Sequence, residues 1–193
     1  MNPFAACRCL LAPLLAFAGL AHPALGQGHG QPAFVAIAAL PPLADGLAVD
    51  LGEGIAGTLR HGALFGPIGL KPGKRTLTVR HQPEDKTHAL DLKPGEEFLL
   101  LLAADPKEGI AFRRIDLPKK RDGRSVLRLP GTGDAVWTIG KDKLEPAGKP
   151  VPCKESFKVQ TDDGKTVVEY EASEPGLYLL IPGPGAVSVV LLP

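Results

Sequence analysis

Few residues in this sequence have the type and spacing that catalysis requires. The only serines are Ser125, Ser156, Ser173 and Ser188, and none lies in the G-x-S-x-G motif that exposes a hydrolase nucleophile. The chain also lacks a phosphate-binding glycine loop and a dinucleotide-binding motif. The sequence therefore predicts a protein that is not an enzyme and has no cofactor.

Two short motifs resemble functional signatures but lack the context that those signatures need. Arg60-His61-Gly62 is similar to the triplet of histidine phosphatases, which requires helix-backed strands and a second acid. The mature chain has no long amphipathic helical pattern, so we expect His61 in a turn or on the surface. Residues 129–133 (LPGTG) match a sortase motif that works only near the carboxyl end, so a strand end followed by a glycine turn is favoured.

One internal cluster could bind a metal ion. His81, Glu84, Asp85 and His88 lie in the segment HQPEDKTH, which a hairpin loop could fold into a ligand set for Zn²⁺. Their spacing matches no strong metal signature. An exposed polar hairpin tip is therefore favoured, and a metal site is the alternative.

The single tryptophan, Trp137, could serve as a platform for a sugar ring. In the segment DAVWTIG it alternates onto the same face as Ala135 and Ile139, which is the more apolar side of a strand. We therefore predict that Trp137 packs in a core.

Residues 1–26 have the layout of a secretory signal peptide, with a basic residue, an apolar run and the small residues Ala24 and Gly26 ahead of Gln27. The apolar run is too short to span a bilayer, which needs about 20 residues. We predict cleavage after residue 26, a flexible tail over residues 27–32, and a periplasmic or secreted mature protein with no membrane span.

Cleavage before Gln27 would change the chemistry of two residues. His29 would become third from a free amine, and the amine, two amides and the imidazole could bind Cu(II) or Ni(II) in a plane. Cys153 would be the only remaining cysteine, so no intramolecular disulfide could form. We predict that Cys153 is a small buried or half-buried residue, with an intermolecular disulfide or a reactive thiol as the alternative.

The elements that must position these residues are short strands. The chain contains 23 glycines and 20 prolines, which would interrupt long helices but suit strands joined by tight turns. Period-two or apolar runs predict six strands in the first half, at residues 33–40, 47–51, 63–70, 75–81, 87–92 and 97–104.

A second set of strand patterns begins after residue 106. Its runs lie at residues 110–117, 125–129, 135–140, 155–160, 166–172, 177–181 and 186–192. Between the sets, the segment RRIDLPKKRDGR (residues 113–124) is rich in basic residues and reads as an exposed connector. We predict two tandem antiparallel β-sandwiches over residues 33–112 and 125–193, with a single sandwich as the alternative.

The charge balance disfavours nucleic acid as a partner. Lys and Arg number 22 against 21 Asp and Glu, so the formal net charge is +1. The connector nevertheless concentrates positive charge, and an acidic polysaccharide or a protein partner could contact it. The candidate contact residues are Arg113, Arg114, Lys119, Lys120, Arg121 and Arg124.

The segments FVAIAALPPLADGLAVDLGEG, LFGPIGLKPGKRTLTVRH and LDLKPGEEFLLLLA resemble small immunoglobulin-like domains of exported bacterial proteins. With RRIDLPKKRDGRSVLRLPGTGDAVWTIG, the chain from about residue 33 resembles periplasmic accessory proteins of alginate O-acetylation. The resemblance implies two tandem β-sandwiches and a non-enzymatic helper that binds polymer or enzyme partners of an acetylation complex. It transfers no catalytic residue.

These observations favour a non-catalytic, exported binding or adaptor protein that assists exopolysaccharide modification. A structural envelope or extracellular matrix protein without a small-molecule ligand is the main alternative. An unrecognised hydrolase or metal enzyme is a third.

Overall fold

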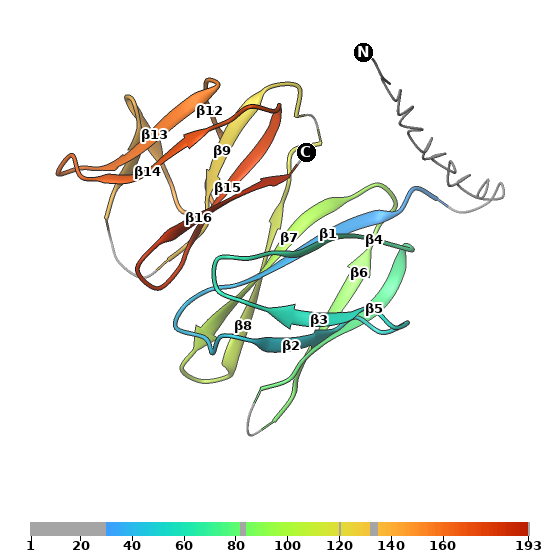
Figure 1. The fold of residues 1–193 in the computed structure, drawn as a ribbon. Coiled ribbons are helices and arrows are strands. Elements are labelled where there is room, and N and C mark those ends of the chain that lie inside the picture. The colour runs from blue at the N-terminus through green and yellow to red at the C-terminus, as the bar shows by residue number, and fades with distance from the viewer. Residues whose placement is uncertain (1–29, 82–83, 120, 132–134, 193) are drawn as a thin grey trace, which may run out of the picture.

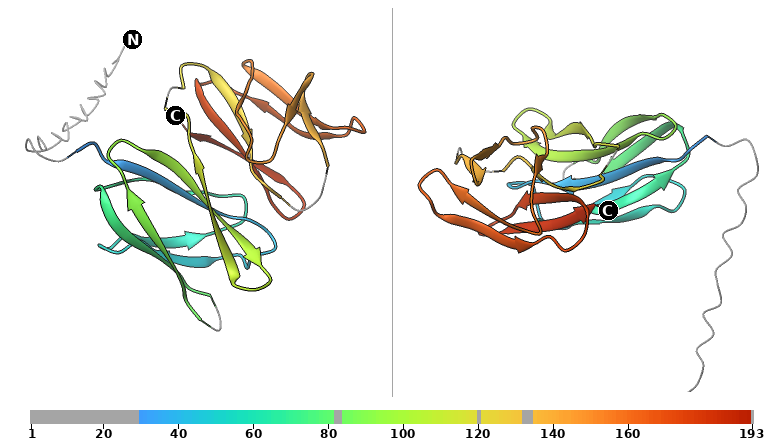
Figure 2. Two further views of the ribbon diagram at one scale, coloured as in Figure 1. Left: turned by 180° about the vertical axis from the view of Figure 1, so that it is seen from behind. Right: turned by 90° about the horizontal axis from the view of Figure 1, so that it is seen from above.

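The computed structural model describes residues 30–81, 84–119, 121–131 and 135–192. Over these residues the fold is all-β, with four four-stranded sheets that form two lobes side by side (Figures 1 and 2). The expected all-β class with two tandem β-sandwiches is confirmed.

The first domain contains the first eight strands. They are β1 (Ala33–Ala39), β2 (Leu47–Asp50), β3 (Ala56–Leu59), β4 (Phe65–Leu70), β5 (Gly73–Val79), β6 (Lys86–Leu92), β7 (Glu97–Asp105) and β8 (Gly109–Asp116). Their order is β4-β1-β7-β8 in one sheet and β3-β2-β5-β6 in the other.

The second domain contains the remaining eight strands. They are β9 (Arg124–Arg128), β10 (Trp137–Ile139), β11 (Asp142–Leu144), β12 (Val151–Pro152), β13 (Ser156–Thr161), β14 (Thr166–Glu171), β15 (Gly176–Pro182) and β16 (Val187–Leu192). Their order is β12-β9-β15-β16 in one sheet and β11-β10-β13-β14 in the other.

The two domains share one topology, because adding eight to each strand number of the first domain gives the sheets of the second. Each domain has one parallel pair, β1 with β7 and β9 with β15, and its other pairs are antiparallel. The register agrees as well. Leu40 N donates to Leu102 O, and Leu129 N donates to Leu180 O at the corresponding place, both at 2.9 Å. The chain is therefore an internal structural repeat.

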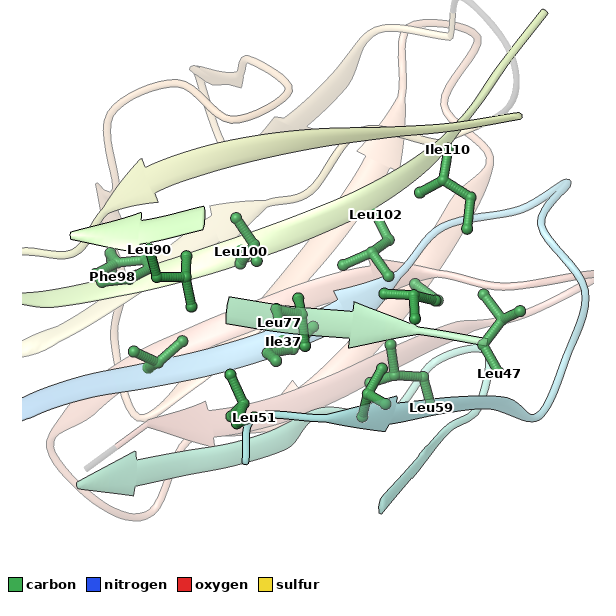
Figure 3. Close-up of a cluster of buried hydrophobic side chains, with 14 of the residues drawn as sticks. Ile37, Leu47, Leu51, Leu59, Leu77, Leu90, Phe98, Leu100, Leu102 and Ile110 are labelled. Carbon is green, nitrogen blue, oxygen red and sulfur yellow. The ribbon is translucent and has the colours of Figure 1, made fainter. Parts of the chain in front are cut away.

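The core of the first domain lies between its two sheets (Figure 3). Ile37 and Leu100 come from one sheet, and Leu47 and Leu77 come from the other. Leu77 and Val79 are fully buried, as the alternation in RTLTVRH predicts. The second domain has an equivalent core, which includes Trp137, Phe157 and Tyr178.

A third core joins the domains. It forms where the sheet containing β1 and β7 meets the sheet containing β9 and β15. Ala38 and Leu101 from the first domain pack in one cluster with Leu127 and Leu179 from the second. β1, β7 and β15 therefore bury apolar residues on both faces, which explains continuous runs such as FLLLL.

The corresponding strands of the repeat supply this third core. In the register of the repeat, Leu127 takes the place of Ala38, and Leu179 takes the place of Leu101. The domains thus pack through equivalent faces, as the subunits of a two-fold symmetric dimer do.

The boundary between the domains differs from the expected one. Residues 113–116 belong to β8, which pairs with β7, and Arg124 begins β9. The linker between the strands therefore spans residues 117–123, and the strand expected to open the second set completes the first sandwich. The predicted boundary was wrong because it relied on the basic side chains of residues 113–116. These residues lie in an edge strand, and the exposed charged side chains of an edge strand look like those of a loop in the sequence.

Candidate functional site

The five expected contact residues that the structure describes do not form one free basic patch. Arg114 lies in β8, where its guanidinium pairs with Glu96 at 2.8 Å and with Asp116 at 2.7 Å. Its Cζ atom also lies 3.9 Å from the centre of the Phe98 ring. Although burial opposes the effect, the hydrogen bond from Arg114 holds the pKa of Glu96 below its usual value. Arg114 is thus engaged within its own domain.

Arg121 and Arg124 also have partners within the protein. Arg121 Nη2 lies 2.5 Å from Glu97 Oε1, and its side chain is 10% exposed. Arg124 Nε donates to Ala172 O at 2.6 Å, and its Nη2 donates to Ser173 O at 2.9 Å. The guanidinium of Arg124 therefore joins the start of β9 to the loop between β14 and β15.

Besides Arg114, which is exposed although it is paired, two of the expected contact residues that the structure describes are exposed. Arg113 projects from β8, and Lys119 lies in the linker. Lys120 lies outside the described residues, as does His29 with its expected copper or nickel site.

Lys119 lines an open groove at the start of β1. The groove has a volume of about 520 Å³, and its walls are Gln31, Pro32, Phe34, Gly95, Glu97 and Lys119. Phe34 is 41% exposed, and it is the only large hydrophobic residue that is exposed among those described. We call this the Phe34 groove. It combines an accessible aromatic ring with an amide, a carboxylate and an ammonium group.

Two local features of the sequence position the Phe34 groove: a turn at Gly95 and the alternation of side chains along β1. Gly95 N donates to Gln31 O at 3.1 Å, and Gly95 has a φ of 66°, which glycine adopts without strain. Alternation along β1 places Phe34 on the same side as Ala36 and Ala38, which pack in the interdomain core. Phe34 therefore continues that apolar face beyond the part that the second domain covers.

The segment HQPEDKTH was expected to form a polar hairpin tip or a metal site. Its described side chains make separate contacts. The His88 ring stacks on Phe112, with centroids 4.5 Å apart, and burial lowers the pKa of His88. Arg80 pairs with Asp85 at 3.9 Å. Within the described ranges, no group of three His, Cys, Asp or Glu residues is placed to hold a metal ion.

The remaining single residues have structural contacts. His61 Nε2 lies 2.7 Å from Leu43 O, and the backbone N–H of His61 donates to Asp45 at 2.8 Å in a turn. Trp137 is buried in the second core, as predicted. Cys153 is half-buried and has a free thiol, and burial raises its pKa although the charge of Arg124 opposes this.

Sequence reasoning did not identify Phe34 or Arg128 as notable residues. Arg128 is 5% exposed and lines a cavity of about 230 Å³ in the second domain. The period of two in SVLRL places Arg128 on the same face as the buried Val126, which was the available indication. For Phe34, the only indication was a large aromatic residue at the first outward position of β1.

No helix in the described part of the chain is long and apolar enough to cross a membrane. Comparison of the sequence with protein-family models and with curated proteins finds no match.

Proposed function

We propose that this chain is a non-catalytic, exported binding protein that contacts an acidic polysaccharide and assists its modification. The observation that carries the proposal is the Phe34 groove, where an exposed aromatic ring lies in one open groove with Lys119 and Gln31. An aromatic ring provides an apolar surface for a sugar ring, and amide and ammonium groups supply hydrogen bonds and positive charge.

The groove suits a polymer better than an enclosed small molecule. It is open to solvent, so sugar units on either side of the bound one can extend out of it. Arg121 Nη2 lies 2.5 Å from Glu97 Oε1, so the negative charge of Glu97 is already paired with a positive charge. The electrostatic repulsion between Glu97 and an anionic ligand is therefore weaker. We therefore propose a polyuronate chain as the occupant, bound by Phe34 and Lys119.

Binding to immobilised alginate, measured at low and at high salt, tests the proposal. We expect Phe34→Ala to weaken binding at both salt concentrations. We expect Lys119→Ala to weaken it chiefly at low salt, because exposed charges are screened beyond about 8 Å at physiological ionic strength. Lys158→Ala, which removes an exposed charge from the outer sheet of the second domain, is the matched control and should bind normally.

Each other outcome counts against the proposal. Equal binding by the wild type and by Phe34→Ala would exclude the groove as the contact site. No binding to alginate, together with capture of a single envelope protein through the groove, would make the occupant a protein. If neither binds, the alternative of a structural envelope or matrix protein is favoured.

Export is part of the proposal and has its own test. Residues 1–26 lie outside the described residues, so the expected signal peptide stands on the sequence pattern alone. Intact-mass analysis of the periplasmic or secreted protein should give a chain that begins at Gln27. A chain that begins at Met1 would contradict export by cleavage.

A further inference from the structure

Arg128 is the only charged residue that is buried among those described, with 5% exposure. Its guanidinium carbon lies 4.2 Å from the centre of the Trp137 ring. Its Nη1 donates to Ala135 O at 2.9 Å and lies 3.4 Å from Leu144 O. The protein thus holds one side of the guanidinium firmly in place.

The other edge of the guanidinium has no acceptor among the residues that the structure describes. Nε is fully buried and lacks a hydrogen-bond partner, and Nη2 makes no hydrogen bond to any described residue. Leaving a buried donor of a charged group unpaired is unfavourable. Nη2, which is not buried, is therefore the donor left for a ligand, and a guanidinium N–H pairs well with a carboxylate oxygen.

The internal repeat shows that the fold does not need an arginine at this position. Leu129 corresponds to Leu40 in the register of the two domains, so Arg128 corresponds to Ala39. Ala39 is fully buried in the first core, where a methyl group fills the equivalent space. The second domain therefore places a charged, hydrogen-bonding group where its counterpart has only an apolar one.

The cavity beside Arg128 has the charge and size for a small anion. Its volume is about 230 Å³, and Lys143, Glu145, Val136 and Pro146 contribute to its lining. Lys143 pairs with Glu145 at 3.0 Å, and both side chains are more than half exposed. Arg128 and Lys143 contribute two positive charges and Glu145 contributes one negative charge, so the described lining carries a net positive charge.

We propose that this cavity, the Arg128 cavity, binds the carboxylate of a small sugar acid. One carboxylate oxygen accepts a hydrogen bond from the free Nη2 of Arg128, and the Lys143 ammonium group supplies a further positive charge. The ligand contains one acid group and has about the size of one monosaccharide. The site goes beyond the proposed function, because it lies in the second domain and shares no residue with the Phe34 groove.

Trp137 provides a direct measurement of binding, because it is the only tryptophan in the chain. Its fluorescence should change in a saturable manner when glucuronate is added to the mature protein. Glucose, which has a hydroxymethyl group where glucuronate has the carboxylate, should cause no saturable change. The Arg128 Nε–H resonance in a nitrogen-correlated NMR spectrum should shift over the same concentrations.

Variants test the assignment of each charge. Arg128→Lys keeps the charge but removes the Nη2 donor, so glucuronate binding should weaken at least tenfold. Lys143→Ala should weaken binding severalfold, and Glu145→Gln should strengthen it. Both of these side chains are largely exposed, so these variants remain informative if Arg128→Lys does not fold. Lys158→Ala is the control and should bind like the wild type.

Several results would overturn the proposal. Equal responses to glucose and glucuronate would remove the carboxylate as the recognised group. Acetate or sulfate that binds as tightly as glucuronate would show an adventitious ion only. Unchanged affinity in both Lys143→Ala and Glu145→Gln would place any binding elsewhere. None of these results bears on alginate binding at the Phe34 groove, so the two proposals fail separately.

Discussion

Arg124 shows how a basic side chain that suggests a ligand contact can instead hold the fold together. Its guanidinium donates to Ala172 O and Ser173 O, and its side chain is 24% exposed. Arg124→Ala removes two charge-assisted hydrogen bonds, so we expect it to lower the free energy of unfolding by about 1.5–3 kcal/mol. Urea denaturation followed by circular dichroism would measure the change.

Arg124→Lys is the informative companion variant, because an ammonium group keeps the charge without the planar pair of donors. It should recover only part of the lost stability. If Arg124→Ala instead unfolds like the wild type and binds alginate more weakly, Arg124 is a ligand contact and its structural assignment is wrong.

His88 should make stability depend on pH. Burial lowers its native pKa, whereas histidine in the unfolded chain titrates near pH 6.5. Between these two pKa values the unfolded chain binds more protons. The contribution of His88 to stability is therefore fully present above about pH 6.5 and is lost as the pH falls from there through the native pKa.

The variant His88→Tyr tests this sign, because it keeps an aromatic ring beside Phe112 and removes the titrating imidazole. We expect the melting temperature of the variant to fall less than that of the wild type between pH 7 and pH 5. Between pH 7 and pH 8 the two proteins should behave alike. An equal fall in both proteins at acid pH would assign the effect to other groups.

At the scale of the elements, the pairing of β1 with β4 depends on a glycine. Gly66 has a φ of 111°, and a Cβ atom at this position would lie 2.7 Å from Val35 O. Gly66→Ala would therefore strain the backbone and push β4 from β1, at a cost of about 1–3 kcal/mol. Thermal denaturation should show a melting temperature lower by several degrees.

Gly69 is the matched control on the same strand. A Cβ atom there would meet the Phe34 ring at 3.4 Å, which is ordinary contact with a side chain that can move, and its φ is not in the left-handed region. Gly69→Ala should change the melting temperature much less. Equal effects of the two substitutions would mean that the cost arises from β4 in general and not from the backbone of Gly66.

The sequence predicted strands well where they contribute several side chains to a core. Leu77 and Val79 in β5 are clear examples, because alternation directly reports a half-buried strand. The sequence analysis missed β3, β11 and β12. These are short, and β3 contains Gly57 while β12 contains Pro152, residues that weaken a strand pattern. Their pairing is imposed by neighbouring strands, which a local pattern does not contain.

The candidate site was less predictable than the fold. Lys119 was expected as a contact, but the groove that it lines also needs Phe34 and Gln31, which lie far from it in the sequence. Arg114 and Arg121 were expected to contact a ligand, yet they form ion pairs with Glu96 and Glu97. Residue types alone predict charges but not which charges meet, because that depends on how distant strands pair.

At the scale of the whole molecule, the interdomain core should make the two domains unfold together. Unfolding either domain would expose the apolar face of the other, including Leu101 or Leu179. We expect one urea transition, with Trp137 fluorescence, which reports the second domain, coinciding with circular dichroism, which reports both.

Replacing Leu101 and Leu179 together by glutamate would bury charges in the interdomain core, while each sandwich keeps its own core. The single urea transition should then split into two, one for each domain. Matched substitutions of Thr76 and Lys158, which lie on the outer sheets, should leave one transition. Two transitions in the wild type would show that the interdomain core does not couple the domains.

The internal repeat also determines which parts of this chain can diverge. Each copy is the binding surface of the other, so a larger side chain at Ala38 must be accommodated by residues such as Leu127 and Leu179. Changes on the faces of the inner sheets that form the interdomain core are therefore acceptable mainly in compensating pairs. The outer sheets, and the faces of the inner sheets that point into each domain, have no such reciprocal constraint. A new binding specificity can therefore arise in one copy alone. Arg128 is such a difference, because the corresponding residue of the first domain is Ala39.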